Sequence, residues 1–168
     1  MYNYCGFCGS DQLQKNSSEH DECLSCKKIN FVNLASAGWC YLIDSEGNVG
    51  LARRAHEPRK GKYDEAGWFV DSCDLSCEDA IIRELKEELG ISVAVGRLLT
   101  CWHIYRGHEE TAENELVGIT FLATTDQIEI TLSDEHEEYR WVTPEEAKEL
   151  IKVEGIHRDI QAYIDLQG

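Results

Sequence analysis

The sequence predicts an α/β fold, an α/β/α sandwich with a mixed sheet, that follows a small N-terminal unit. Three observations support this prediction. Paired cysteines are confined to the first 33 residues, short apolar and aromatic-rich runs begin near residue 35, and helical patterns fall among and after these runs. A chain of 168 residues with 42% hydrophobic residues can bury one ordinary core and carry one small appendage. We therefore expect two domains, residues 1–33 and residues 34–168.

The N-terminal unit carries two C-x-x-C pairs in the spacing C-x2-C-x14-C-x2-C, formed by Cys5, Cys8, Cys23 and Cys26. Disulfides are the alternative, but such pairs in a chain without a secretion signal more often hold a metal ion. Four sulfur ligands leave no open position for a substrate, so we expect one structural Zn²⁺. A segment this short has too little core to fold unaided, and residues 1–33 are therefore predicted to be a zinc ribbon.

The runs after residue 35 are predicted to be mostly strands. Residues 37–44 and 48–55 form an expected hairpin, with Gly47 in the turn. Further strands are expected at residues 66–71, 93–106, 115–125, 128–131 and 137–142. Two unpaired cysteines in apolar stretches are expected to be buried thiols, namely Cys40 and Cys101.

Three helices are predicted. The first lies between Ser76, which has N-cap chemistry and an acid three residues on, and Gly90, which is placed to end it. A second begins at Thr143-Pro144-Glu145-Glu146, a cap followed by a proline at the first helical position. The third covers residues 153–166.

Net charge and hydropathy exclude some classes of function. The chain has 16 Lys and Arg against 32 Asp and Glu, a formal charge of −16, which argues against non-specific nucleic-acid binding. No apolar run approaches the roughly 20 residues that cross a bilayer, and the N-terminus lacks signal-peptide order, so we expect no membrane partner and a cytoplasmic location. The one basic cluster, residues 53–62, offers Arg54 and Arg59 to phosphates; a solvated loop is the alternative.

The first helix carries three acids, Glu84, Glu87 and Glu88, at positions i, i+3 and i+4. On a helix these positions lie on one side, where like charges repel. One interpretation is a solvated face relieved by Arg83 and Lys86. The other is a site for hard divalent cations, which take oxygen ligands and neutralise phosphate.

The stretch "RELKEELGI", residues 83–91, resembles the second half of the Nudix box, G-x5-E-x7-R-E-U-x-E-E-x-G-U with U apolar, at every named position. Residues 53–71 resemble the run that leads into the box in Nudix proteins bearing a zinc ribbon, an arrangement similar to that of the NADH pyrophosphatases. The resemblance implies hydrolysis of a nucleoside diphosphate linked to another moiety. It also implies Mg²⁺ or Mn²⁺ as the catalytic metal, held by Glu84, Glu87 and Glu88.

The resemblance assigns roles to further residues. Arg83 is expected to orient the acids by pairing with Glu87 or Asp74. A further acid from outside the helix is expected, with Glu135 preferred over Glu137 and Glu138 because an acid ahead of a tryptophan recurs in the family. The partner is then a small nucleotide, such as NADH or ADP-ribose, and a homodimer is among the expected assembly states.

The first half of the box departs from the family pattern. Gly67 stands for the first glycine of a pair, Trp68 replaces the second, and Asp74 supplies the acid in the spacing G-x6-D-x8-R. A tryptophan at a tight turn changes the loop, and Trp68 is also a candidate for stacking on a base. The alternative function is therefore a catalytically impaired binding or regulatory module. An isomerase acting on a prenyl diphosphate is a weaker alternative, because no matching cysteine and glutamate pair is recognisable.

Overall fold

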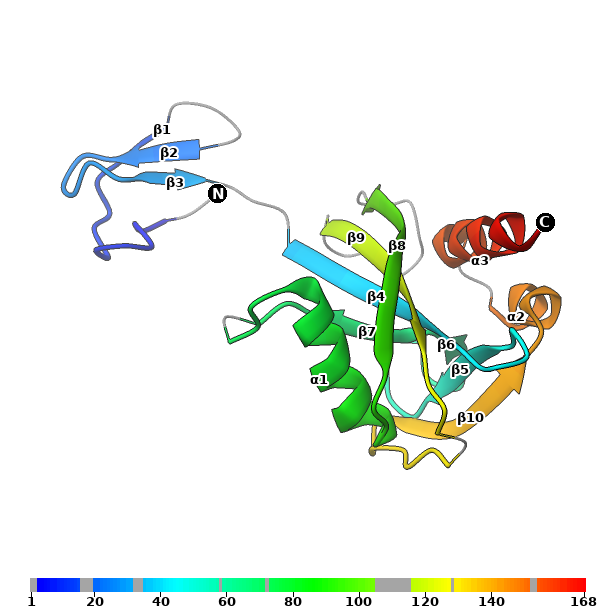
Figure 1. Cartoon of the computed structure of the whole chain (residues 1–168). Coiled ribbons are helices and arrows are strands. Elements are labelled where there is room, and N and C mark those ends of the chain that lie inside the picture. Colours follow the sequence, from blue (N-terminus) through cyan, green and yellow to red (C-terminus); the bar gives the residue numbers. More distant parts are fainter. Residues whose placement is uncertain are drawn as a thin grey trace. The chain divides into compact units, whose positions relative to one another are not determined.

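The computed structural model describes residues 3–15, 20–31, 35–57, 59–71, 73–104, 116–127, 129–151 and 154–168. The chain divides into two compact units, Met1–Ala35 and Ser36–Gly168 (Figure 1). In these described parts, no helix is long and apolar enough to cross a membrane.

The N-terminal unit is a small antiparallel sheet in the order β1-β2-β3, with β1 at Leu13–Lys15, β2 at His20–Cys23 and β3 at Ile29–Phe31. Its apolar side chains point largely to solvent, as Phe31 does with 55% of its surface exposed. Among its described residues, the buried side chains are Cys5, Cys23, Asp21 and Asn30. The described residues of this unit therefore form no apolar core, and their buried centre consists of thiols and polar groups.

The second unit is built on a sheet in the order β10-β5-β4-β9-β8, with β6 paired to β5 and β7 paired to β4. Its strands are β4 (Ala35–Ile43), β5 (Val49–Arg54), β6 (Tyr63–Asp64), β7 (Ala66–Phe69), β8 (Ala94–Ile104), β9 (Leu116–Thr124) and β10 (His136–Val142). The predicted hairpin is confirmed, because β4 and β5 pair antiparallel and Gly47 adopts the left-handed φ of 85° that the turn requires.

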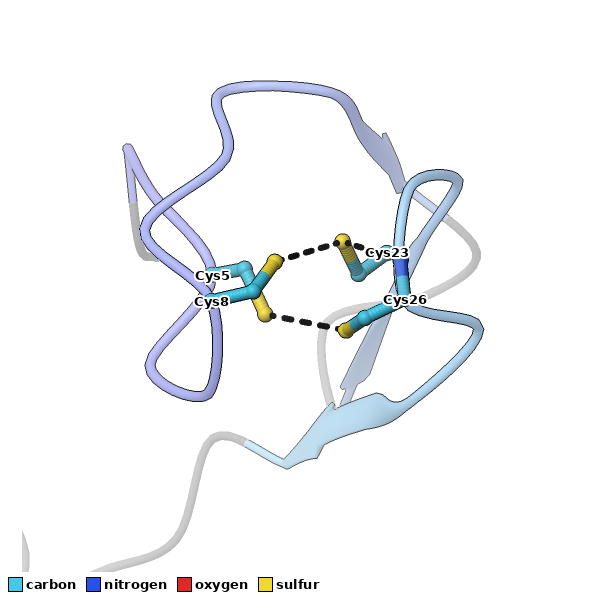
Figure 2. Close-up of side chains that lie close together, drawn as sticks. All are labelled: Cys5, Cys8, Cys23 and Cys26. Atoms are coloured by element: carbon cyan, nitrogen blue, oxygen red, sulfur yellow. Dashed lines mark hydrogen bonds between the residues drawn. The ribbon is translucent and has the colours of Figure 1, made fainter.

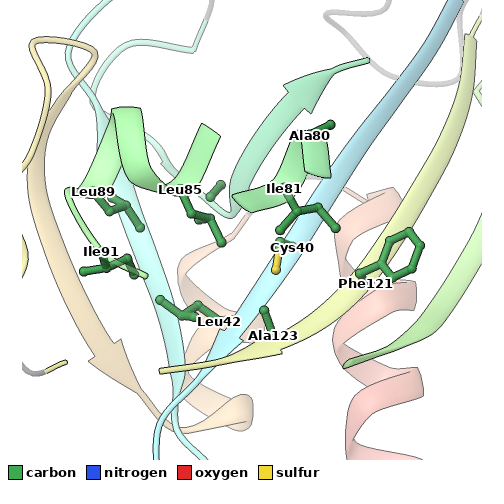
Figure 3. Packing of buried hydrophobic residues seen from close by; sticks show 10 residues of the cluster. Cys40, Leu42, Ala80, Ile81, Leu85, Leu89, Ile91, Phe121 and Ala123 are labelled. Carbon is green, nitrogen blue, oxygen red and sulfur yellow. The ribbon is translucent and has the colours of Figure 1, made fainter. Parts of the chain in front are cut away.

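Helix α1, Cys77–Leu89, lies on one face of the sheet. It has both predicted ends: the Ser76 hydroxyl accepts a hydrogen bond from the Asp79 amide at 3.1 Å, and Gly90 closes the helix at φ 70°. Its buried side chains pack on alternate residues of β4 and on β9, as Figure 3 shows, in a core that includes Ala80, Ile81, Leu85, Leu89, Cys40, Leu42, Phe121 and Ala123.

Helices α2, Pro144–Leu150, and α3, Glu154–Gln167, cover the other face. The intervening residues of β4, Tyr41 and Ile43, point into this second core with Ile156 and Ile160 of α3. Helix α2 begins with the predicted capping box between Thr143 and Glu146. The expected α/β/α layering is thereby confirmed.

Two local predictions are wrong. The described residues of 128–131 do not form a strand, because the backbone amides of Thr131 and Ser133 donate to the carbonyls of Leu89 and Glu88 at the end of α1, at 2.9 and 2.8 Å. Cys101 is exposed on β8, whereas Cys40 is buried as predicted.

Candidate metal centre and active site

The four paired cysteines of the N-terminal unit converge on one point. Their sulfur atoms all lie within 4.8 Å of one another, and Figure 2 shows them pointing toward a common centre. Cys5 Sγ lies 3.7 Å from Cys26 Sγ, and Cys8 Sγ lies 3.7 Å from Cys23 Sγ. A tetrahedral zinc site with Zn–S bonds of about 2.3 Å has sulfur atoms separated by about 3.8 Å. All four thiols are free, so the cluster has the geometry of a metal site and contains no disulfide.

Backbone N–H groups donate hydrogen bonds to two of the four sulfurs. The amide of Phe7 donates to Cys5 Sγ at 3.4 Å, and that of Cys26 donates to Cys23 Sγ at 3.5 Å. Although burial raises the pKa of Cys5, the backbone N–H groups of Phe7 and Cys8 outweigh it and lower that pKa to about 6. A lowered pKa favours the thiolate, which is the form that ligates metal. His20 is not part of the cluster.

The second unit contains a pocket of about 460 Å³ formed by β4, the end of β5, the β6–β7 segment, α1 and the start of β10. Its wall contains acids from three separate parts of the chain and two arginines. The charged members are Arg54, Arg59, Asp64, Glu65, Glu84, Glu88 and Glu135. The chain, although strongly acidic, thus places cations and carboxylates together at one concave site.

The acids of α1 do not share one environment. Glu84 and Glu88 line the pocket, and Glu88 is buried with its Oε2 atom lacking a hydrogen-bond partner in the structure. Glu87 does not line the pocket, and 62% of its side chain is exposed. Periodicity groups the three residues on one side, but the neighbouring strands cover only part of that side.

Arg83 connects the helix to the preceding loop. Its Nε and Nη2 atoms donate to the two carboxylate oxygens of Asp74 at 3.1 and 3.0 Å, while Nη1 donates to Glu84 at 2.6 Å and to Glu87 at 3.5 Å. Nη2 also donates to the Phe69 carbonyl at 3.4 Å. The expected pairing of Arg83 with these acids is therefore found, and its side chain holds Glu84 at the edge of the pocket.

The other predicted site residues are placed as follows. Arg54 and Glu135 line the pocket, and Arg59 lines it while pairing with Asp64 at 2.6 Å. The alternatives to Glu135 are engaged elsewhere, since Glu137 and Glu138 each lie 3.1 Å from Arg53. The backbone of Trp68 is part of β7, but its side chain lies outside the described residues.

The residues of this pocket that the sequence did not predict include Trp39, Asp64, Glu65 and His136. Trp39 packs against Trp102 with ring centroids 6.4 Å apart and planes at 23°. The only signal for Asp64 and Glu65 was an acidic pair directly after the basic cluster. Their burial depends on β6 and β7 pairing with different strands, which a local pattern does not reveal.

The residues of the pocket fit hard divalent cations, which take oxygen ligands. Burial, followed by the negative charges of Glu135 and Glu84, raises the pKa of Glu88 to about 8. The pocket carboxylates do not converge as the thiols do. Among the described residues, only the four cysteines bring three or more ligand atoms within 4.8 Å of one another.

A model of a known protein family matches the chain over most of its length. The NUDIX domain family matches residues 33–163, which is most of the chain. The chain belongs to the Nudix family. The predicted enzyme class, a Nudix pyrophosphatase, is confirmed at the level of that family and by the names of two relatives.

Three proteins show the breadth of the Nudix similarity. The chain is 30% identical over 107 residues, 63% of its length and 74% of the relative's, to the CTP pyrophosphohydrolase of Escherichia coli. It is 28% identical over 97 residues, 58% of its length, to the ADP-ribose pyrophosphatase of Methanocaldococcus jannaschii, of which it spans only 55%. The crystal structure of a NUDIX hydrolase from Nitrosomonas europaea has the same fold, with a TM-score of 0.74 and 22% identity, over 96% of this chain and 90% of that one.

The stability of this Nudix domain is expected to fall as pH rises from about 5 to about 8 in buffer without Mg²⁺ or Mn²⁺. A glutamate in the unfolded chain loses its proton near pH 4.5, whereas folded Glu88 keeps its proton until about pH 8. The unfolded state therefore binds fewer protons across this interval, so the free energy of unfolding decreases with rising pH. Thermal denaturation across the pH range should show a shallower slope for Glu88→Gln than for wild type. Equal slopes in the two proteins would contradict the expected pKa.

Proposed function

We propose that the Nudix domain, residues 34–168, hydrolyses the pyrophosphate of a nucleoside diphosphate linked to another moiety, with Mg²⁺ or Mn²⁺ held by carboxylates of α1. The observation that supports this most strongly is the shared pocket, in which Glu84 and Glu88 face Arg54, Arg59 and Glu135. Cations and acids in one concave site can bind a polyanion and a divalent ion together. A solvated acidic helix would not need the burial of Glu88.

The side chains in and beside the pocket have different proposed roles. Glu84 and Glu88 hold the cations, and Arg83 acts as a positioning residue because it contacts Glu84 and the loop rather than the pocket. Glu87 completes the Nudix box and is a further proposed ligand, with 62% of its side chain exposed. The cations, when bound, neutralise phosphate charge and lower the pKa of the attacking water. Arg54 and Arg59 supply positive charge for the phosphates, and Glu135 adds a carboxylate from outside the helix.

A dinucleotide or nucleotide sugar, such as NADH or ADP-ribose, is the proposed substrate class. The relatives are named for CTP and for ADP-ribose, so a nucleotide is common to both. Trp39 lies in the pocket wall and packs against Trp102. This position allows the Trp39 ring to stack on a base or nicotinamide ring. Trp68 remains a second candidate for that contact.

A substrate panel tests this proposal. Purified full-length protein, with Mg²⁺ or Mn²⁺, is incubated with NADH, ADP-ribose, CTP and a dinucleoside polyphosphate, and the nucleotide products are separated by ion-exchange chromatography. We expect cation-dependent release of a nucleoside monophosphate from at least one compound. Binding of a nucleotide without turnover would instead support the alternative, a binding or regulatory module. That alternative is favoured by Trp68 at a glycine position, and it is weakened because Arg83 still holds Asp74.

For the N-terminal unit we propose a zinc ribbon, residues 1–33, whose Zn²⁺ is structural. Its support is the sulfur geometry, together with the lack of an apolar core among the residues of the unit that the structure describes. With four thiolates around it, the ion has no coordination position left for a substrate.

A further inference from the structure

Glu65 is a carboxylate that neither the Nudix box nor the proposed mechanism uses. It lies between β6 and β7, immediately after Asp64, and only 3% of its surface is exposed. Among the described residues, neither of its carboxylate oxygens has a hydrogen-bond partner of ordinary geometry, and its close charged neighbour is the carboxyl group of Asp64. Glu65 lines the same pocket as Glu84 and Glu88, but it comes from the segment between β6 and β7 and not from α1. A buried acid without a compensating cation therefore belongs to the wall of the site where cations are proposed to bind.

Such a group is costly unless something compensates it, because burying an ionised carboxylate without a partner costs several kcal/mol or shifts its pKa instead. Among the described residues, no ion pair reaches Glu65. The nearby Arg59 pairs with Asp64 at 2.6 Å, and Arg83 is engaged by Asp74 and Glu84. A leucine would fill the same buried space without this cost.

Two states can relieve the cost. In the first, Glu65 stays protonated beside Asp64, and burial with the charge of Asp64 does raise the pKa of Glu65 well above its ordinary value. In the second, a divalent cation supplies the missing charge and replaces the missing partners. The second state also accounts for Asp64 Oδ1 and Glu88 Oε2, which are buried and unpartnered in the same pocket.

We propose that Glu65 is a further ligand of the divalent cations in this pocket, acting with Glu88 from the strand side. This inference rests on the proposed function only in assuming that the pocket binds such cations. Because the carboxylate oxygens do not meet within 4.8 Å as a group of three in the described structure, cation binding must draw Glu65 and Glu88 toward each other. The segment between β6 and β7 thereby contributes an acid to a site otherwise built from α1 and Glu135.

The test is a Mn²⁺ titration of the zinc-loaded full chain, in which free Mn²⁺ is followed by electron paramagnetic resonance. Glu65→Gln removes the charge and keeps the shape, and we expect it to weaken Mn²⁺ binding about tenfold or more, or to remove one bound ion. Glu78→Gln is the matched control, because Glu78 is exposed in the first turn of α1 and the change in net charge is the same. That variant should bind Mn²⁺ as wild type does.

A second readout is independent of affinity. We expect Mn²⁺ to raise the melting temperature of wild type more than that of Glu65→Gln, while without Mn²⁺ the variant is at least as stable as wild type because the uncompensated acid is gone. If Glu65→Gln does not fold, Glu65→Asp keeps the charge one methylene away and should show intermediate affinity.

The outcomes separate the two proposals. Unchanged Mn²⁺ affinity in Glu65→Gln, with weakened affinity in Glu88→Gln, would overturn the role of Glu65 and leave the proposed function standing, since glutamine mimics a permanently protonated Glu65. Unchanged affinity in both variants would overturn the cation pocket itself.

Discussion

Glu88→Gln is expected to lower cation-dependent hydrolysis by about a hundredfold or more. Even groups that only support a metal ligand typically account for 10- to 100-fold in affinity or activity, and Glu88 is a buried carboxylate inside the pocket. Glu84→Gln should have an effect of similar size, because Glu84 also lines the pocket and is held there by Arg83. Initial rates with Mg²⁺ and with Mn²⁺, on the substrate that the panel identifies, measure both.

The same series should include Glu87→Gln and Glu78→Gln. Sequence alone gives the three acids of the box equal weight, whereas the 62% exposure of Glu87 leads us to expect its effect to be smaller than that of Glu88. Glu78→Gln should leave the rate unchanged. Circular dichroism checks the fold, and Glu88→Gln should be folded because glutamine has nearly the same shape as the buried, protonated Glu88. Wild-type rates in both Glu84→Gln and Glu88→Gln would leave only an acidic helix beside a pocket.

The double substitution Cys23→Ser and Cys26→Ser is expected to remove zinc from the chain and to unfold the N-terminal unit. In zinc-finger peptides, metal binding contributes about 10–16 kcal/mol, and that binding energy is also the folding energy. In the part of the unit that the structure describes, no apolar core is present to replace this energy. Metal analysis should fall from about one zinc per chain to none, and limited proteolysis should remove the N-terminal unit while the Nudix domain, which has its own two cores, resists.

The control is Cys73→Ser with Cys77→Ser, two thiols outside the cluster, which should keep full zinc occupancy. Full occupancy in the Cys23 and Cys26 variant would show that the sulfur geometry is not a zinc site, since two remaining thiols cannot hold a structural ion.

The features that the sequence predicted correctly depend on residues that are close together in the chain. Helix α1 has its ends at Ser76 and Gly90 because capping and left-handed closure depend on a few adjacent residues. The cysteine cluster was equally predictable, since two tight turns are enough to gather four sulfurs. In both cases the spacing along the chain fixes the geometry.

What the sequence did not reveal depends on pairing between distant segments. Nothing local distinguishes the buried Glu65 from an exposed acid in a loop; its burial follows from β6 joining β5 while β7 joins β4. The segment 129–131 has a strand-like pattern, but the free carbonyls at the end of α1 bind its neighbouring amides instead. The different exposures of Glu87 and Glu88 likewise depend on what packs beside the helix.

Arg83 donates two hydrogen bonds to the carboxylate of Asp74, and this interaction affects how much the segment before α1 can vary in length. The segment from Gly67 in β7 to Arg83 in α1 is one residue longer on each side of Asp74 than the family pattern, yet the carboxylate of Asp74 still accepts hydrogen bonds from the guanidinium at 3.0 and 3.1 Å. This side-chain interaction allows the backbone before the helix to vary in length, because it depends on the position of the Asp74 carboxylate and not on the number of residues that precede it. A sequence pattern with fixed spacing would therefore fail to detect members of the family in which the segment before the helix has gained or lost a residue.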